Sequence, residues 1–248
     1  MIDLKKDVKY VKGVGPNRVQ LLNKLGIFTL EDLITYYPRT YEDRSKPKSL
    51  LECIDGEEAL IEVIAISKMI ESKFSRKTMQ KIMIRDNTSS AEAIWFNQTY
   101  LKSKFTVGKK YRMYGKIEKK YGKIIIASPV FDEYGSTQNT GRIIPIYPLT
   151  YQLSQNTLRK IIENAMNEVY GNLPETLPQY IIKTNRILGI NDAIKTIHFP
   201  QELKDFKIAR KRLVFEELLI TQLSLMSLKN RDVLEEKGIK FSSEYKIE

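Results

Sequence analysis

Cysteine and histidine are almost missing from this chain of 248 residues, which has one of each, Cys53 and His198. A disulfide within the chain is therefore excluded, and a zinc site built from these residue types is not expected. A histidine-based catalytic set would have to use His198, which lies in a short apolar segment ended by Pro200. That setting favours a packing or capping role, so we expect neither metal ligands nor catalytic residues in this chain.

Long apolar runs and nucleotide-binding motifs are also missing. No run approaches the roughly 20 apolar residues that a membrane span needs, and the start of the chain has no apolar signal-peptide segment. Neither G-x-x-x-x-G-K-[ST] nor G-x-G-x-x-G occurs. We therefore expect a soluble intracellular protein that has no membrane partner and binds no cofactor through this part of the chain.

Acidic residues are outnumbered by basic ones, 30 against 41, which gives a formal net charge of +11. A balance this basic favours a polyanionic partner, either nucleic acid or an anionic membrane surface. The hydrophobic share of 42% is ordinary for a soluble globular protein. The composition thus predicts a folded domain or two with an acidic partner.

The hydrophobic period divides the chain into three parts. Residues 8–37 predict two or three short helices, and residues 37–44 an extended connector. From residue 58 to residue 131 apolar and polar residues alternate, which predicts five strands, a polar basic hairpin loop at residues 71–78 and a short helix around Tyr100. This order predicts a five-stranded antiparallel OB-fold barrel, and the whole chain belongs to the α+β class.

Helical spacing returns after a polar linker at residues 131–141 and an extended segment at residues 143–148. Ser154 is placed to cap the next helix, and its apolar face consists of Leu158, Ile161, Ile162, Ala165, Met166 and Val169. A further helix near residues 178–188 and a long one over residues 207–229 follow. These helices are expected to pack either on the barrel or on a part of the protein outside this chain.

The stretch from Ala91 to Tyr100 is the centre of the predicted barrel. Successive strand side chains point to opposite faces, so Trp95 and Phe96 cannot both fill the core. We expect Trp95 to point inward and Phe96 outward, and one helical turn after Phe96 would bring Tyr100 to the same side. The two rings would then form a stacking platform for nucleic-acid bases, although they could instead cap the end of the barrel.

Basic residues surround this aromatic pair in the sequence. Only Glu118 opposes the cations between Leu101 and Ile126, whereas tyrosines alternate with them. A groove that binds nucleic acid needs cations that contact phosphates and flat rings that stack on bases. The alternative is that this run of charged residues is only a solvated surface. The candidate nucleic-acid-binding residues are Phe96, Tyr100, Lys102, Lys104, Lys109, Arg112, Lys116, Lys119, Lys120, Tyr121, Lys123, Lys73, Arg76 and Lys77.

The sequence has a glycine turn near its start, from Gly13 to Pro16, which allows two interpretations. Its pattern is similar to a helix-hairpin-helix motif, whose turn amides bind DNA phosphate. The alternative is a small helical brace, with Pro16 at the first position of a helix and Thr29 capping the next one together with Asp32.

A series of short motifs, in order along almost the whole chain, resembles the N-terminal part of the RecG family of branched-DNA helicases. The motifs are Val14-Gly15-Pro16, Leu25-Gly26-Ile27, Asp32-Leu33, residues 38–44, Trp95-Phe96-Asn97-Gln98-Thr99-Tyr100-Leu101, Tyr121-Gly122-Lys123, Ile146-Tyr147-Pro148, Leu158-Arg159-Lys160, Ile197-His198-Phe199-Pro200, and Arg212 with residues 215–219. Each motif is weak alone, but the series is specific.

The resemblance implies a helical segment at residues 1–54, an OB-fold wedge domain at residues 55–135 and a helical scaffold at residues 136–248 that leads to a motor absent from this chain. It also implies that Phe96 and Tyr100 stack on bases at the branch point of replication forks and Holliday junctions. ATP and Mg²⁺ would be bound only by the full-length helicase, acting in DNA repair and recombination as a monomer in the bacterial cytoplasm. In the family, the turn at Gly13 resembles scaffold more than a DNA contact.

Two other functions fit the residues. An OB-fold module that binds RNA, as in tRNA recognition, would use the same rings and cations, because stacking tolerates both sugars. A scaffold for protein interactions would use the helices and would show no salt-sensitive DNA binding.

Overall fold

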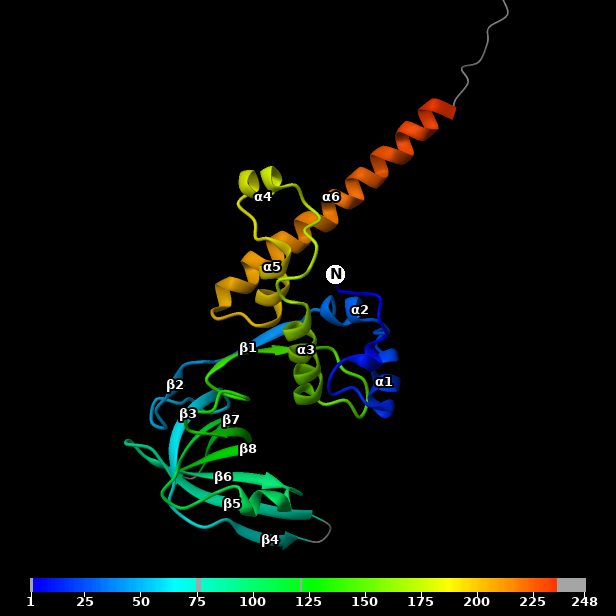
Figure 1. Cartoon of the computed structure of the whole chain (residues 1–248). Helices are drawn as coiled ribbons and strands as arrows, with labels where there is room; N and C mark the ends of the chain where they lie inside the picture. Colours follow the sequence, from blue (N-terminus) through cyan, green and yellow to red (C-terminus); the bar gives the residue numbers. More distant parts are fainter. Residues whose placement is uncertain (1, 75–76, 121, 236–248) are drawn as a thin grey trace, which may run out of the picture.

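The structure is a computed structural model of the chain and describes residues 2–74, 77–120 and 122–235. Figure 1 shows a curved sheet beside a group of short helices, with one long helix, α6 (Leu203–Glu235), projecting away from both. The fold is of the α+β class, as the sequence predicted. None of the helices within these ranges is long and apolar enough to cross a membrane.

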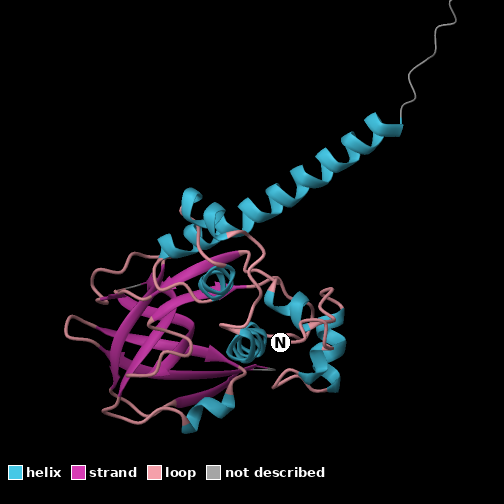
Figure 2. Cartoon of the chain, turned by 45° about the horizontal axis from the view of Figure 1, so that its top comes forward, coloured by secondary structure: helices cyan, strands magenta, loops and turns pink. Residues whose placement is uncertain are grey.

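Seven strands form the main sheet, in the order β2-β3-β7-β8-β6-β5-β4. An additional pairing joins β3 to β5, so β3, β7, β8, β6 and β5 pair in a continuous ring, whose strong curvature is visible in Figure 2. The bounds are β2 (Pro47–Lys48), β3 (Glu58–Ala65), β4 (Ile70–Phe74), β5 (Lys77–Arg85), β6 (Ser90–Phe96), β7 (Lys110–Lys120) and β8 (Lys123–Glu133).

The prediction of five antiparallel strands was wrong in number and in direction. β6 pairs with β8 in parallel, as does β2 with β3, while the other pairs are antiparallel. The first half of the predicted basic hairpin loop belongs to β4, which pairs with β5 over Ile70–Phe74, and residues 77–78 of that loop already belong to β5. A polar strand at the margin of a sheet shows little hydrophobic alternation, because neither of its faces is fully buried. Similarly, β8 continues to Glu133, into the predicted linker.

Inward-facing side chains of these strands form one core. Trp95 is 1% exposed, its ring lies 5.3 Å from Phe105 and 6.1 Å from Phe131 between centroids, and its Nε1 donates to the Pro129 carbonyl over 2.8 Å. Buried aliphatic residues of β3, β5 and β8 complete the cluster. The period-two pattern of the sequence therefore does mark the core face of the sheet.

A separate two-stranded sheet joins segments that are a hundred residues apart in the sequence. β1 (Thr40–Arg44) pairs antiparallel with β9 (Arg142–Ile146), with Thr40 opposite Ile146. The sequence predicted extended chain for both segments but not their pairing. Local periodicity carries no information about which distant strand a segment pairs with.

The helical part has a second core, built around α3 (Gln155–Val169). Ser154 accepts a hydrogen bond from the Thr157 amide over 3.2 Å, and all six residues of the predicted apolar face are buried. Against it pack η1 (Val8–Tyr10), α1 (Pro16–Asn23) and α2 (Leu30–Ile34). Thr29 and Asp32 form the predicted capping box at the start of α2.

The remaining helices are α4 (Gln179–Asn185), α5 (Ile190–His198) and α6, whose first part packs on α5. Arg212 of α6 is fully buried and pairs with Glu175 at 2.7 Å and Glu216 at 2.5 Å. His198 is also fully buried, as expected for the packing or capping role predicted for it. Further along α6, apolar side chains are exposed, namely Leu218, Ile220, Leu223, Leu225, Met226 and Leu228.

Candidate nucleic-acid interface

The end of β6 presents Phe96 to solvent while Trp95 fills the core behind it. The side chain of Phe96 is 51% exposed. On the neighbouring strand Met79 lies opposite Phe96, and both belong to the outer face of the sheet because the flanking residues Gln80 and Trp95 are buried. The predicted assignment of the two aromatic residues to opposite faces is therefore confirmed.

The chain turns sharply after Phe96. Asn97 has a φ of 55°, a left-handed conformation that asparagine tolerates better than most residues. Its amide donates to the Thr78 carbonyl over 2.8 Å, and its Oδ1 accepts from the Thr78 amide over 3.0 Å. The buried Gln80 then accepts from the amide of Gln98 over 3.0 Å. These polar residues determine the geometry of the turn, and only their position at the end of a strand marks them in the sequence.

Tyr100 lies on a separate short helix, η2 (Thr99–Ser103), and its ring is 64% exposed. Its hydroxyl donates to the Gln98 side chain over 2.9 Å, and the neighbouring Leu101 is buried in the sheet core. The predicted short helix is confirmed. No single helical turn relates Phe96 to Tyr100, contrary to the prediction, because Phe96 belongs to the strand and the left-handed Asn97 intervenes.

Four of the predicted cations belong to segments adjacent to the rings. Lys102 and Lys104 are exposed on and just after η2. Lys77 lies on the same face of β5 as Met79, two residues away, and so on the face that carries Phe96. Lys73 is exposed on β4, opposite Thr78, and so on the other face of the sheet from Phe96.

Three other lysines lie at the opposite end of the sheet. Lys119, Lys120 and Lys123 surround the turn between β7 and β8, and the start of β8 pairs with Ala91 at the start of β6. Phe96 is five residues further along β6, a distance of about 17 Å at about 3.3 Å per residue. The lysines that follow one another in the sequence therefore form two groups in space, because those at the β7–β8 turn lie far from the rings.

The remaining predicted cations differ in their partners. Arg112 is half-buried and pairs with Glu62 at 2.8 Å, and Lys109 pairs with Glu133 at 3.7 Å. Lys116 is exposed on β7. Arg76 and Tyr121 lie outside the described residues.

The glycine turn at Gly13 has its polar groups engaged by the helical part. The Asn164 side chain of α3 donates to the Lys12 carbonyl over 2.7 Å, and Arg18 donates to the Gly13 carbonyl over 2.6 Å. The amide of Val14 donates to the Val11 carbonyl over 3.0 Å. These contacts fit a turn that supports the packing of the helices, and the Val14 amide is already used by a hydrogen bond within the turn.

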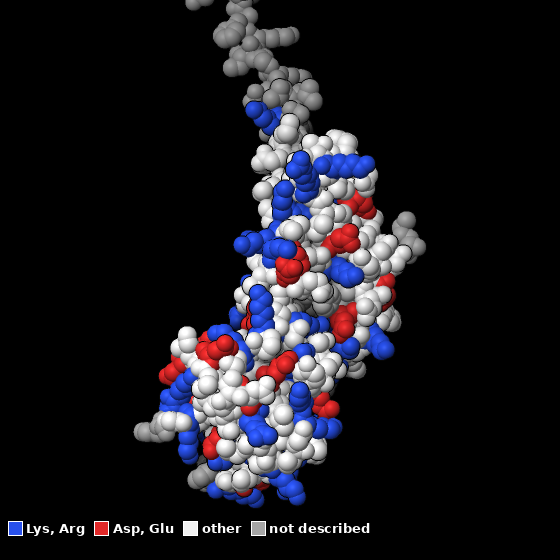
Figure 3. Space-filling model, turned by 90° about the vertical axis from the view of Figure 1, so that its left-hand side faces the viewer, with Lys and Arg blue, Asp and Glu red and all other residues white. Residues whose placement is uncertain are grey.

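The outer surface of the sheet end thus combines flat rings with lysines. Figure 3 shows basic side chains spread over one face of the molecule, with acidic ones among them. Exposed rings on an ordered backbone can stack on bases that are not paired, and nearby cations can contact phosphates. No base-edge reader such as a helix inserted in a groove is needed for binding of this kind.

The fold and this surface together define the class: an α+β module whose mixed seven-stranded sheet is braced by helices and carries exposed aromatic rings at one strand end. The family follows from comparison with known proteins. The model of the RecG wedge domain matches residues 7–169, and the chain belongs to that family.

Curated relatives extend the similarity over most of the chain. It is 36% identical over 236 residues to the ATP-dependent DNA helicase RecG of Thermotoga maritima, and 29% identical over 244 residues to that of Streptococcus pneumoniae. These alignments cover 92% and 96% of the chain but 30% and 35% of the relatives. The chain therefore spans about a third of the length of the curated relatives it matches.

A solved structure of RecG bound to a three-way DNA junction has the same fold. It superposes with a TM-score of 0.85 at 34% identity, over 93% of this chain and 32% of that one.

Proposed function

We propose that this chain is the branched-DNA-binding module of a RecG-like, ATP-dependent DNA helicase, with Phe96 and Tyr100 stacking on bases exposed at the junction. The observation that carries the proposal is the exposure of both rings beside the sharp turn at Asn97. Large apolar rings are usually buried, so exposed rings held by an ordered backbone indicate a partner that covers them. The known structure of a relative with a three-way DNA junction supports DNA as that partner.

The cations support a division of roles. Lys77, Lys102 and Lys104 belong to segments next to the rings and would contact the phosphates of the strand whose bases stack, with Lys73 on the adjoining edge strand β4 as a further candidate. The group at Lys119, Lys120 and Lys123 would contact a second arm, with Lys116 between the two groups; Lys109, Arg76 and Tyr121 remain candidates. Arg112 already has Glu62 as partner, so its contribution would be smaller.

The finer fold assignment is that of an OB-fold barrel at residues 55–135, between helical parts at residues 1–54 and 136–248. The pairing of β3, β7, β8, β6 and β5 in a ring supports it, because closure of five strands is the feature of that barrel. The separate hydrophobic clusters of the sheet and of the helices support the division into parts.

The motor functions belong to the rest of the protein. The relatives are named ATP-dependent helicases, and about two thirds of their length lies outside the match. ATP and Mg²⁺ would be bound there, and the whole protein would act as a monomer on DNA in the bacterial cytoplasm. The exposed apolar side chains of α6 beyond Glu217 fit a surface that another part of the protein covers.

The proposal is tested by fluorescence anisotropy with labelled forked DNA and matched duplex. Phe96→Ala and Tyr100→Ala should each weaken fork binding by about 1–3 kcal/mol, the usual range for a base–aromatic stack, and should leave duplex binding nearly unchanged. Tyr180→Ala is the matched control, since Tyr180 is an exposed ring on α4, far from the sheet in the sequence. Fork affinity should also fall steeply as salt rises.

Equal loss of fork and duplex binding, or no loss with either ring variant, would contradict stacking at a junction. A structured RNA that competes better than the fork would favour an RNA-binding module instead.

A further inference from the structure

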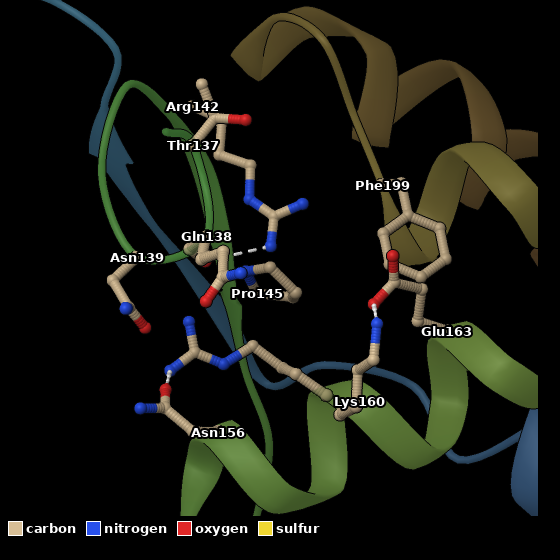
Figure 4. A pocket seen from close by; sticks show the side chains of 10 residues that line it. Thr137, Gln138, Asn139, Arg142, Pro145, Asn156, Lys160, Glu163 and Phe199 are labelled. Carbon is tan, nitrogen blue, oxygen red and sulfur yellow. Dashed lines mark hydrogen bonds and ion pairs between the residues drawn. The ribbon is translucent and has the colours of Figure 1, made fainter. Parts of the chain in front are cut away.

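A polar pocket lies away from the aromatic surface, between α3, β9 and the loop that follows β8. Its volume is about 430 Å³. Figure 4 shows Arg142 extending from the strand side toward α3, and Lys160 pointing to Glu163 on the helix. Three cations line it, Arg142, Arg159 and Lys160, against one carboxylate, that of Glu163.

The two guanidinium groups lack a carboxylate partner in the described part of the chain. Arg142 donates to the Gln138 carbonyl over 3.0 Å, and Arg159 donates to Asn156 Oδ1 over 2.8 Å and the Gln155 carbonyl over 3.3 Å. Lys160, by contrast, is ion-paired with Glu163 at 2.9 Å. Salt bridges elsewhere, such as that of Arg112, show how the fold usually neutralises its part-buried arginines.

Two donors in this pocket are buried and unused. Arg142 Nε and Arg159 Nη1 have no hydrogen-bond partner among the described residues. A buried donor without a partner costs free energy, and for a charged group the cost is larger. Such a group in a native structure calls for an explanation, and an anion bound by the guanidinium groups is one.

The electrostatic setting favours an anion over water. Burial, together with repulsion from Arg44 and Arg142, lowers the pKa of Arg159 to about 10. Glu42, whose negative charge acts on Arg159 in the opposite direction, is already bound by Arg44 at 2.5 Å. An anion between the guanidinium groups would relieve this repulsion.

The rim of the pocket is held in place before any ligand arrives. The buried Asp132 accepts hydrogen bonds from the amides of Asn139 and Thr140, each over 2.8 Å, and from both of their side chains. Arg44 donates to the Asn139 carbonyl over 2.8 Å and accepts, through its own carbonyl, from the Gly141 amide over 2.7 Å. A loop fixed in this way positions Arg142 at low entropic cost.

We propose that this pocket binds a phosphate group, held by the guanidinium forks of Arg142 and Arg159, with Lys160 at its edge. The planar fork of a guanidinium matches the oxygens of a phosphate. The volume lies within the usual range for small-ligand sites and leaves room for an attached sugar. The phosphate could come from a DNA backbone or from a free phosphate compound, and the two sources are separated by experiment.

The first arm measures inorganic phosphate and pyrophosphate binding to the 248-residue chain by calorimetry, with acetate as the carboxylate control. Saturable phosphate binding is expected, at least tenfold weaker in Arg142→Gln and Arg159→Gln. Lys24→Gln, which changes the net charge equally at an exposed position on the surface, should bind as the wild type does. Circular dichroism checks folding; if Arg159→Gln does not fold, Arg142→Gln and the charge-preserving Arg142→Lys decide.

The second arm asks whether phosphate displaces labelled forked DNA. If a DNA phosphate occupies the pocket, phosphate should compete, and Arg159→Gln should reduce the salt slope of DNA binding by about one. If the ligand is a free phosphate compound, the variants should bind DNA as Lys24→Gln does while losing phosphate. Both outcomes support the site. No saturable phosphate binding, binding unchanged in the arginine variants, or acetate binding as tightly as phosphate would overturn it. None of these outcomes depends on Phe96 or Tyr100, so the stacking proposal can fail or succeed separately.

Discussion

Acid should destabilise this protein through its single histidine. His198 has both ring nitrogens engaged inside the helical core: Nε2 lies 2.8 Å from the Ile34 carbonyl and Nδ1 2.8 Å from the Tyr147 hydroxyl. A carbonyl can only accept, so Nε2 carries the proton and Nδ1 accepts from the tyrosine. Burial lowers the pKa of the neutral imidazole to about 4, from an ordinary value of 6.5.

The size of the effect follows from linkage. Because the folded pKa is below the unfolded one, the unfolded chain takes up the proton first as pH falls. The contribution of His198 is therefore complete above about pH 6.5 and is lost progressively toward about pH 4. The total is about 3 kcal/mol, at 1.36 kcal/mol per pKa unit, and about 2 kcal/mol of it should be lost between about pH 7 and about pH 5.

Urea unfolding across this pH range measures the loss, and His198→Gln is the matched control. Glutamine can donate to Ile34 and accept from Tyr147, but it does not titrate. The variant should be less stable at neutral pH and should have a flatter pH profile, since carboxylates with lowered pKa, such as Asp32 and Glu175, contribute equally to both proteins. The imidazole can also be followed directly by nitrogen-correlated NMR.

Two results would refute the reasoning. One is an imidazole that titrates near its ordinary pKa in the folded protein. The other is a His198→Gln variant whose stability falls with pH as steeply as that of the wild type.

Two further predictions concern single buried side chains. Trp95→Ala should destabilise the sheet by about 3–5 kcal/mol, because its ring fills the core and its Nε1 bonds Pro129; an unchanged melting temperature would contradict this placement. Arg212→Met should cost about 3–5 kcal/mol, since it leaves the carboxylates of Glu175 and Glu216 without their partner; urea unfolding should show partial recovery when Glu216→Gln is added.

The sequence predicted those features that depend only on residues close together in the chain. The six apolar residues of α3 share one face of a helix, so their spacing alone identified the second core. In β6, alternation was enough to separate Trp95 from Phe96. The capping box of Thr29 and Asp32 also depends only on residues three apart.

Features that depend on distant segments could not be predicted in the same way. Pairing of β1 with β9, the parallel pairing of β6 with β8, and the meeting of Arg142 with Arg159 arise from topology, which no local period encodes. The lysines at residues 102–123 read as one run, whereas the β7–β8 hairpin separates them in space. The role of Asn97 was missed because a left-handed residue looks like any other polar residue in a sequence.

The long helix α6 has a consequence for any body that packs on its distal part. Its 33 residues span about 50 Å at about 1.5 Å per residue, and each residue advances the helical phase by about 100°. One alanine inserted after Leu219 would therefore swing such a body about 100° around the helix axis, while shifting it by only about 1.5 Å. Seven inserted residues would nearly restore the phase, within about 20°, and shift it by about 10 Å. The rotation of such a body about the α6 axis, more than its shift along the axis, would therefore decide whether it and the sheet can contact the same DNA branch point.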